Sequence, residues 1–260
     1  MGGHSQSSGR YEKLLFGEGA VKTIFKAVKY ATKGLGLDRA FITGVSPVIM
    51  SDITSGHNIA ENISLAPKFA DMCGFSDAEV GDTLERIVRE CGFPSEMTEE
   101  ASDMMRKFYN GHLFCPRSDD LLYNPTLALY FMKYFQSCCE YPEDMLDENM
   151  AVERGKLAYI SSLSGGDNLI MKALNEPLGI QHLIRGLNVE DMLSGPKSTE
   201  FMASMLFYSG LLTLTGQRTD IGNLILKIPN PVTRRLYAER IREMLLSESD
   251  DRSRARGFAE

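Results

Sequence analysis

The apolar positions of the chain change their spacing near its beginning. In Ala20–Thr32 they recur every three or four residues, which predicts an amphipathic helix that ends before Gly34 and Gly36. The stretch Ala40–Val45 is mainly apolar without that spacing and predicts a short strand covered on both faces. A helix followed by such a strand is typical of an α/β sheet, in which ligands bind at the carboxyl ends of the strands.

Helical spacing dominates the middle of the chain. Ser76–Glu79 has the spacing of a capping box before a first helix, and Thr98 is expected to cap a second one. Asn124–Pro125 combines an N-cap residue with proline at the first helical position, which predicts a third helix. Residues 151–189 are expected to add further short helices.

The last part of the chain mixes helices with a hairpin. An apolar helix is predicted over Thr199–Tyr208, and the stretches Leu211–Thr215 and Leu224–Ile228 predict two strands joined by a glycine-containing loop. Asn230–Pro231 is expected to begin a final amphipathic helix. Helix, hairpin and helix in this order suggest a winged-helix-like unit.

Composition narrows the class of protein. The chain has 260 residues, a net charge of -7 and five cysteines without a Cys-x-x-Cys pair. We therefore expect an intracellular protein with reduced, buried thiols, and neither an apolar N-terminal signal nor a run of about 20 apolar residues suggests a membrane. His112 with Cys115, and the pair Cys138–Cys139, are weak candidates for zinc, because a tetrahedral site needs four placed ligands.

Several short motifs occur in one order along the chain. They are Phe41–Pro47, Ser55–Ile59, Asn62–Leu65, Cys73–Val80, Tyr109–Gly111, Tyr123–Pro125, Gly210–Leu214 and Ile228–Asn230. Together they resemble the predicted AAA-ATPase-like family of P-loop NTPases, over about residues 15–245. Members of that family usually begin with a Walker A loop and a Walker B strand, and many end with a PD-(D/E)XK nuclease-like domain.

The parts of the family that bind phosphate or cut nucleic acid are missing from the sequence. A P-loop needs Gly-Lys-Ser/Thr, which does not occur in the chain, and the nearest string, Gly195–Ser198, contains a proline. No predicted strand ends in the Asp-Glu pair that would hold Mg²⁺, and Leu224–Lys227 lacks the carboxylate of the nuclease signature. The chain thus resembles the later part of the ATPase module.

These observations predict a mixed α/β chain that is mostly helical. The expected parts are the end of a P-loop-type α/β core, a helical lid and a C-terminal winged-helix-like unit. By residue number they are a flexible N-terminus (1–10), the core remnant (11–66), the lid (67–190), the winged-helix-like unit (191–246) and a flexible tail (247–260).

Candidate binding residues follow the predicted strand. The resemblance implies that Thr43 and Ser46 occupy the position of a sensor for a γ-phosphate, and Asn58 could donate to a ligand. The alternative for the first two is a hydroxyl-capped turn, and for Asn58 an Asx turn. His57 is a general base by residue type only, and His112 after its turn is expected to be structural. No residue is assigned a catalytic role.

The final helix carries Arg234, Arg235, Arg240 and Arg242, which could meet DNA phosphates. Because glutamates interleave with these arginines and the whole chain is acidic, we favour a solvated, salt-bridged helix face.

Three functions remain open at the level of sequence. We favour a non-catalytic interaction or regulatory module that does not hydrolyse ATP and needs no cofactor. One alternative is half of an ATPase, with a partner that supplies the P-loop, ATP and Mg²⁺; that partner, or a second copy of the chain, would pair with the strand at residues 40–45. The other alternative is a nucleic-acid-binding winged-helix protein.

Overall fold

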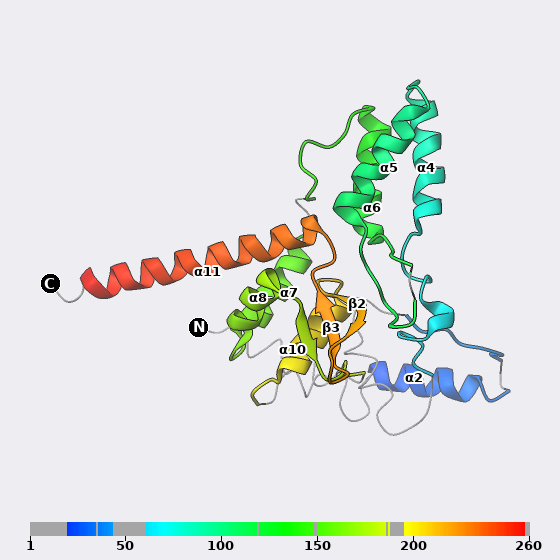
Figure 1. The fold of residues 1–260 in the computed structure, drawn as a ribbon. Coiled ribbons are helices and arrows are strands. Elements are labelled where there is room, and N and C mark those ends of the chain that lie inside the picture. The colour runs from blue at the N-terminus through cyan, green and yellow to red at the C-terminus, as the bar shows by residue number, and fades with distance from the viewer. Residues whose placement is uncertain are drawn as a thin grey trace. The chain divides into compact units, whose positions relative to one another are not determined.

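The computed structural model describes residues 20–34, 36–43, 61–118, 120–147, 150–185, 187 and 195–257 (Figure 1). Within these residues the fold is mixed α/β, with eight α-helices, one short 3₁₀ helix and a three-stranded antiparallel sheet. The chain forms two compact units, the first of residues 1–62 with 184–195 and the second of residues 63–183 with 196–260. Each unit is described by itself.

The first unit contains α2 (Ala20–Ala31), which confirms the predicted amphipathic helix. The predicted strand that follows is wrong over Ala40–Thr43, because these residues are irregular and Phe41 is 66% exposed. An apolar run forms a buried strand only beside sheet neighbours, and no strand pairs with Ala40–Thr43 in the part of the chain that the structure describes. The remainder of the predicted strand lies outside the described residues.

The second unit begins with the 3₁₀ helix η1 (Pro67–Phe69) and continues with three helices that pack together. These are α4 (Asp77–Glu90), α5 (Glu96–Tyr109) and α6 (Pro125–Cys138), which we call the helical group. Their shared core is fully apolar or aromatic, and its residues include Leu84, Ile87, Ala101, Met105, Leu127, Phe131 and Phe135.

Local capping explains where two of these helices start. The capping box before α4 is present, since Ser76 N donates to Glu79 Oε2 over 2.8 Å and Glu79 N donates to Ser76 Oγ over 3.3 Å. The side chain of Asn124 accepts from Thr126 N over 2.9 Å and starts α6. The predicted cap at Thr98 is wrong. Helix α5 already begins at Glu96, so Thr98 lies inside its first turn.

The other elements of the second unit form the strand group. They are α7 (Ala151–Ser162), α8 (Gly166–Asn175), β1 (Leu178–Ile180), α10 (Thr199–Tyr208), β2 (Thr213–Arg218), β3 (Leu224–Lys227) and α11 (Pro231–Gly257). The sheet has the order β1-β3-β2, with Leu178 opposite Leu226 and Leu214 on the other side of that same residue. The predicted hairpin is confirmed, whereas β1 lies where only short helices were expected.

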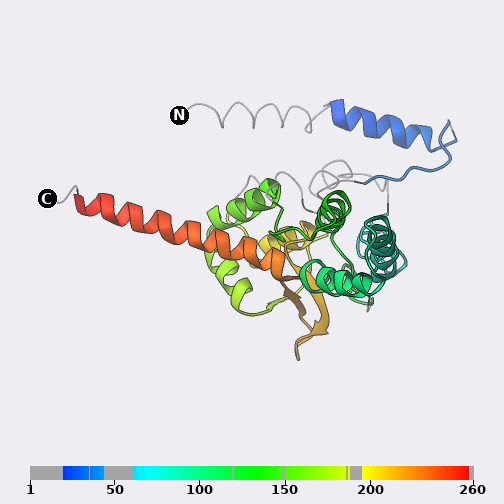
Figure 2. The same ribbon diagram turned by 90° about the horizontal axis from the view of Figure 1, so that it is seen from above.

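Helix α11 connects the two groups of the second unit (Figure 2). It starts at the N-cap Asn230, whose Oδ1 accepts from Thr233 N over 2.9 Å, and its first turns pack against α5, α7 and α8. Val232, Leu236 and Tyr237 are buried there. The helix continues to Gly257, although the sequence predicted a flexible tail from residue 247.

The expectation of five reduced, buried thiols is wrong. Cys91 and Cys139 form a disulfide, Cys73 and Cys138 are exposed, and only Cys115 is a buried free thiol. The bonded pair is 48 residues apart in sequence and meets because the C-terminal ends of α4 and α6 lie together, which no cysteine spacing indicates. Among the described residues, no helix combines the length and apolarity needed to cross a membrane.

Candidate functional site

Four chain segments that carry motif residues, or adjoin them, meet where the helical group and the strand group join. Tyr109–Leu113 begins with the last residue of α5, Leu122–Asn124 precedes α6, Gly210–Leu214 leads into β2, and Pro229–Asn230 precedes α11. His112, Leu113 and Leu122 lie beside the motifs and not within them. We call these four segments the motif junction. Although they are up to about 120 residues apart in sequence, each contacts another of them directly, and these contacts define the candidate functional site.

The first contact is backbone pairing around His112 and Leu113. His112 N donates to Leu122 O over 3.1 Å, and Leu122 N donates back to His112 O over 2.8 Å. Leu113 N donates to Thr213 Oγ1 over 2.6 Å, and this hydroxyl donates to Leu113 O over 3.2 Å. Thr213 is buried, so its hydroxyl satisfies backbone groups that water does not reach.

The second contact joins the end of α5 to the start of α11. Asn230 Nδ2 donates to Tyr109 O over 3.3 Å, and Asn230 is 6% exposed. Gly111 has a φ of +117°, and a Cβ atom at this position would overlap the carbonyl oxygen of Pro229. Glycine is therefore required here for two independent reasons, its backbone conformation and the close approach of a second segment.

The imidazole of His112 is buried and packed, which fits the structural role that the sequence predicts. His112 is 1% exposed, its Nε2 lies 3.2 Å from Gly210 O, and its ring stacks on Phe114 at 5.8 Å between centroids. Burial lowers the pKa of His112 below its ordinary value. Among the described residues, Nδ1 of His112 is the one buried side-chain polar atom without a hydrogen-bond partner.

A second polar cluster fixes Tyr123 against α4. Tyr123 N donates to Phe75 O over 2.9 Å, and its hydroxyl donates to Asp77 Oδ1 over 2.6 Å. Arg106 Nη2 donates to the other oxygen of Asp77 over 2.9 Å. The hydrogen bonds from Arg106 and from Tyr123 lower the pKa of Asp77, which stays ionised and links α4, α5 and the motif junction.

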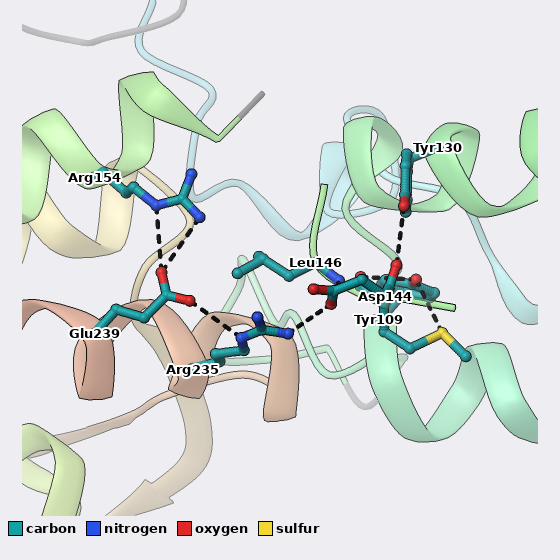
Figure 3. Close-up of polar contacts among 8 residues, drawn as sticks. Tyr109, Tyr130, Asp144, Leu146, Arg154, Arg235 and Glu239 are labelled. Carbon is teal, nitrogen blue, oxygen red and sulfur yellow. Dashed lines mark hydrogen bonds and ion pairs between the residues drawn. The ribbon is translucent and has the colours of Figure 1, made fainter. Parts of the chain in front are cut away.

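An ion-pair network lies beside the motif junction (Figure 3). Arg235 on α11 donates through Nη1 to Asp144 Oδ1 over 2.6 Å and through Nε to Glu239 Oε1 over 3.1 Å. Glu239 Oε2 accepts from Arg154 of α7 over 3.3 Å. Asp144 follows the helical group in the chain, and Leu146 N together with Arg235 lowers its pKa. We call Asp144, Arg154, Arg235 and Glu239 the arginine network.

Within the arginine network only the Arg235–Glu239 pair had a signal in the sequence, namely the interleaved arginines and glutamates of the last helix. Arg235 and Asp144 are 91 residues apart, and neither is part of a motif. The hydrogen bond from Leu113 N to Thr213 Oγ1 was also missed, because the two residues are 100 positions apart. Thr213 itself lies within a segment that carries the resemblance.

The described part of the structure does not bring the predicted binding residues together in a site. Thr43 is exposed in an irregular segment, and Ser46, His57 and Asn58 lie outside the described residues. The motif junction is chemically different, because its polar atoms connect chain segments to one another. Within the described residues, no group of three or more His, Cys, Asp or Glu side chains could hold a metal ion.

Three arginines of α11 are engaged in contacts, and two of them form salt bridges with glutamates of the same helix, as the charge pattern predicted. Arg234 Nη2 donates to Leu174 O over 2.6 Å, and Arg235 belongs to the arginine network. Arg240 donates to Ser161 Oγ and pairs with Glu243 at 3.1 Å. Helix α10, which stands directly before the hairpin, buries six of its ten residues and exposes only Thr199. Arg234, Arg235 and Arg240 are therefore less available to DNA phosphates.

Comparisons with protein-family models, with curated proteins and with solved structures found no match for the chain. The likeness to the AAA-ATPase-like family stays a prediction that is based on the ordered motifs.

Proposed function

We propose that this chain is a non-catalytic portion of an AAA-ATPase-like protein that acts as an interaction or regulatory module without hydrolysing ATP itself. The observation that carries the proposal is the convergence, in the motif junction, of four segments that carry motif residues or adjoin them. Their hydrogen bonds and close contacts explain why these residue types occur together without any chemistry on a substrate. The missing Gly-Lys-Ser/Thr supports the same conclusion, because no P-loop can form without it.

The parts of the module are proposed to be a helical lid and a winged-helix-like unit. The helical group supports the first, and the sheet order β1-β3-β2 with its flanking helices supports the second. Because α10 is buried and three arginines of α11 are engaged, we propose contact with protein rather than with nucleic acid for this unit.

The test is nucleotide binding and hydrolysis by the purified chain. We expect no saturable binding of a fluorescent ATP analogue in the presence of Mg²⁺, and no phosphate release above that of a mock purification. Hydrolysis that co-elutes with the chain and is lost in Thr43→Val would contradict the proposal, since a contaminating ATPase would not respond to that substitution.

A second candidate function is half of an ATPase, which a P-loop-bearing partner completes. The first unit favours it, because Ile24, Tyr30 and Phe41 are 61%, 67% and 66% exposed, and such side chains are typical of a surface that binds another protein. We expect a P-loop partner to form a stoichiometric complex that Phe41→Ser weakens and Leu129→Ser, on exposed α6 surface, does not. Equal affinity of both variants, or no ATP turnover in the complex, would contradict this candidate.

A further inference from the structure

The Cys91–Cys139 disulfide holds together the ends of two helices. Cys91 follows α4 and Cys139 follows α6, with 5.6 Å between their Cα atoms. Aromatic rings pack beside it, with Phe93 stacked on Phe135 at 6.2 Å between centroids. Both bonded cysteines are only partly buried, so a small thiol can reach the bond.

The segment directly after the disulfide runs to α11. We call residues 140–147 the strap. Tyr130 OH donates to Asp144 O and Tyr109 OH donates to Met145 O, each over 2.9 Å. Arg235 of α11 binds the carboxylate of Asp144 (Figure 3). The strap is thus held covalently at its start and by hydrogen bonds and an ion pair at its end.

A covalent bond and a half-exposed ion pair differ greatly in strength. Arg235 and Asp144 are 51% and 49% exposed, and a pair of this kind contributes little against solvent and salt. The disulfide closes a loop that contains all of α5 and all of α6, which restricts the unfolded chain strongly. The link between the end of α4 and the start of the strap therefore depends on the disulfide.

We propose that the Cys91–Cys139 disulfide is a redox-controlled clamp that joins the C-terminal ends of α4 and α6 and fixes the start of the strap to the end of α4. A dithiol reductant opens it in two steps. One thiolate of the dithiol attacks a sulfur of the disulfide and displaces the other cysteine as a thiolate. The second thiol of the reductant then displaces the first cysteine, so that the dithiol is oxidised to a disulfide and the protein gains two thiols.

Opening the clamp releases Cys139 from the end of α4, while the Tyr141 ring on Phe131 and Phe135, Arg235 and the two tyrosine hydroxyls retain their contacts with the strap. Under reducing conditions the last turn of α6 and the first residues of the strap can move away from the end of α4 and become more accessible. In reducing compartments, disulfides are usually transient and redox-sensing, which fits a clamp that opens and closes. This regulation goes beyond the proposed interaction module and needs no nucleotide.

The experiment compares the purified chain in oxidised and in reduced dithiothreitol. Mass mapping of alkylated peptides is expected to show the Cys91–Cys139 bond in the oxidised sample and two additional alkylated thiols in the reduced one. Cleavage by a glutamate-specific protease after Glu140 or Glu143 in the strap is expected to be roughly tenfold faster on reduction, because local opening exposes the segment. Cleavage within α5, after Glu99 or Glu100, should change much less.

Matched cysteine variants separate the clamp from other thiol effects. In the Cys91→Ser variant the protease is expected to cleave the strap fast in both conditions. In Cys138→Ser, next to the bonded Cys139, reduction should speed up cleavage as it does in the unchanged protein. If Cys91→Ser does not fold, reduction of the unchanged protein still gives the readout. The proposal is overturned if no Cys91–Cys139 bond forms under oxidation, if cleavage rises equally in the strap and in α5, or if Cys138→Ser loses the response.

Discussion

Two regions of this chain carry parts of the same family resemblance, but the side chains of one are buried and those of the other are exposed. In the motif junction, Tyr109 and Tyr123 are fully buried, and hydrogen bonds join segments far apart in sequence. In the first unit, Phe41 is 66% exposed, and Ala40–Thr43 form no strand. The residue types of the motif junction are explained by contacts within this chain, whereas for the exposed Phe41 we propose contact with a partner.

The largest expected effect tests the close approach of two segments in the motif junction. Gly111→Ala should lower the free energy of unfolding by about 3 kcal/mol or more, because the Cβ atom meets Pro229 O and the backbone has a φ of +117°. Gly36→Ala is the matched control, with a φ of +120° and nothing within 4 Å of the added atom. Urea unfolding followed by circular dichroism measures both. Equal losses would mean that backbone strain alone accounts for the effect and that the contact with Pro229 contributes nothing.

A smaller effect is expected from the buried hydroxyl that links the helical group to β2. Thr213→Val keeps the shape but leaves Leu113 N without its acceptor, and should cost about 2 kcal/mol in urea unfolding. Thr215→Val, whose hydroxyl is half-buried and donates to Ile225 O, should cost less. If the two variants were equally stable, the Thr213 contact would not be a main support of the motif junction.

The buried histidine predicts a pH dependence. The pKa of His112 is lowered in the folded chain, so the unfolded chain takes up a proton first as pH falls below about 6.5. The contribution of His112 to the free energy of unfolding is fully present above pH 6.5. As pH falls from 6.5 to the lowered pKa, the free energy of unfolding should decrease by about 1 kcal/mol per pH unit. His112→Gln should flatten the curve of unfolding free energy against pH in that window. An unchanged slope in this variant would assign the dependence to other groups.

The arginine network should contribute less to the free energy of unfolding than the buried groups of the motif junction. Arg235→Ala is expected to cost about 0.5 kcal/mol, because Arg235 is 51% exposed and its ion pairs with Asp144 and Glu239 are screened by water. Arg242→Ala, on exposed α11 surface, should change nothing measurable. Thermal unfolding at low and high salt measures both, and the cost of Arg235→Ala should shrink at high salt. A salt-independent loss would indicate that the stem of Arg235 acts by packing.

The smallest effect on stability is expected at Phe41. Phe41→Ser should leave the unfolding free energy of the chain alone within about 0.5 kcal/mol, because the side chain is mostly exposed. Calorimetric unfolding of the isolated chain measures it. A loss of several kcal/mol would mean that Phe41 is buried within this chain, and the contrast between the two regions would disappear.

Local signals in the sequence predicted most elements of the second unit. The capping box at Ser76–Glu79, the start of α6 at Asn124–Pro125 and the stop of α10 before Gly210 depend on groups within about four residues of one another. Thr98 failed as a helix start because a residue of the right type is not a cap unless the backbone before it leaves the helix. The three-residue strand β1 was not predicted, because it is too short to give an apolar pattern of its own.

Long-range contacts were outside the reach of such signals. The disulfide partner of Cys91, the pairing of Asp144 with Arg235 and the link from Thr213 to Leu113 join residues 48, 91 and 100 positions apart. Each depends on helices and strands packing first, since the packing alone sets the distance between the groups.

The sequence by itself determined the helices, the hairpin, the order of the motifs and the absence of a P-loop, because each depends on residue types at short spacing. Only the tertiary structure decided that four segments carrying or adjoining the motifs form one buried junction and that Ala40–Thr43 form no strand. The physical reason is the same in both cases. A strand, a buried imidazole or a glycine at a close contact is defined by its neighbours in space, and those neighbours are distant in the chain or absent from the described residues.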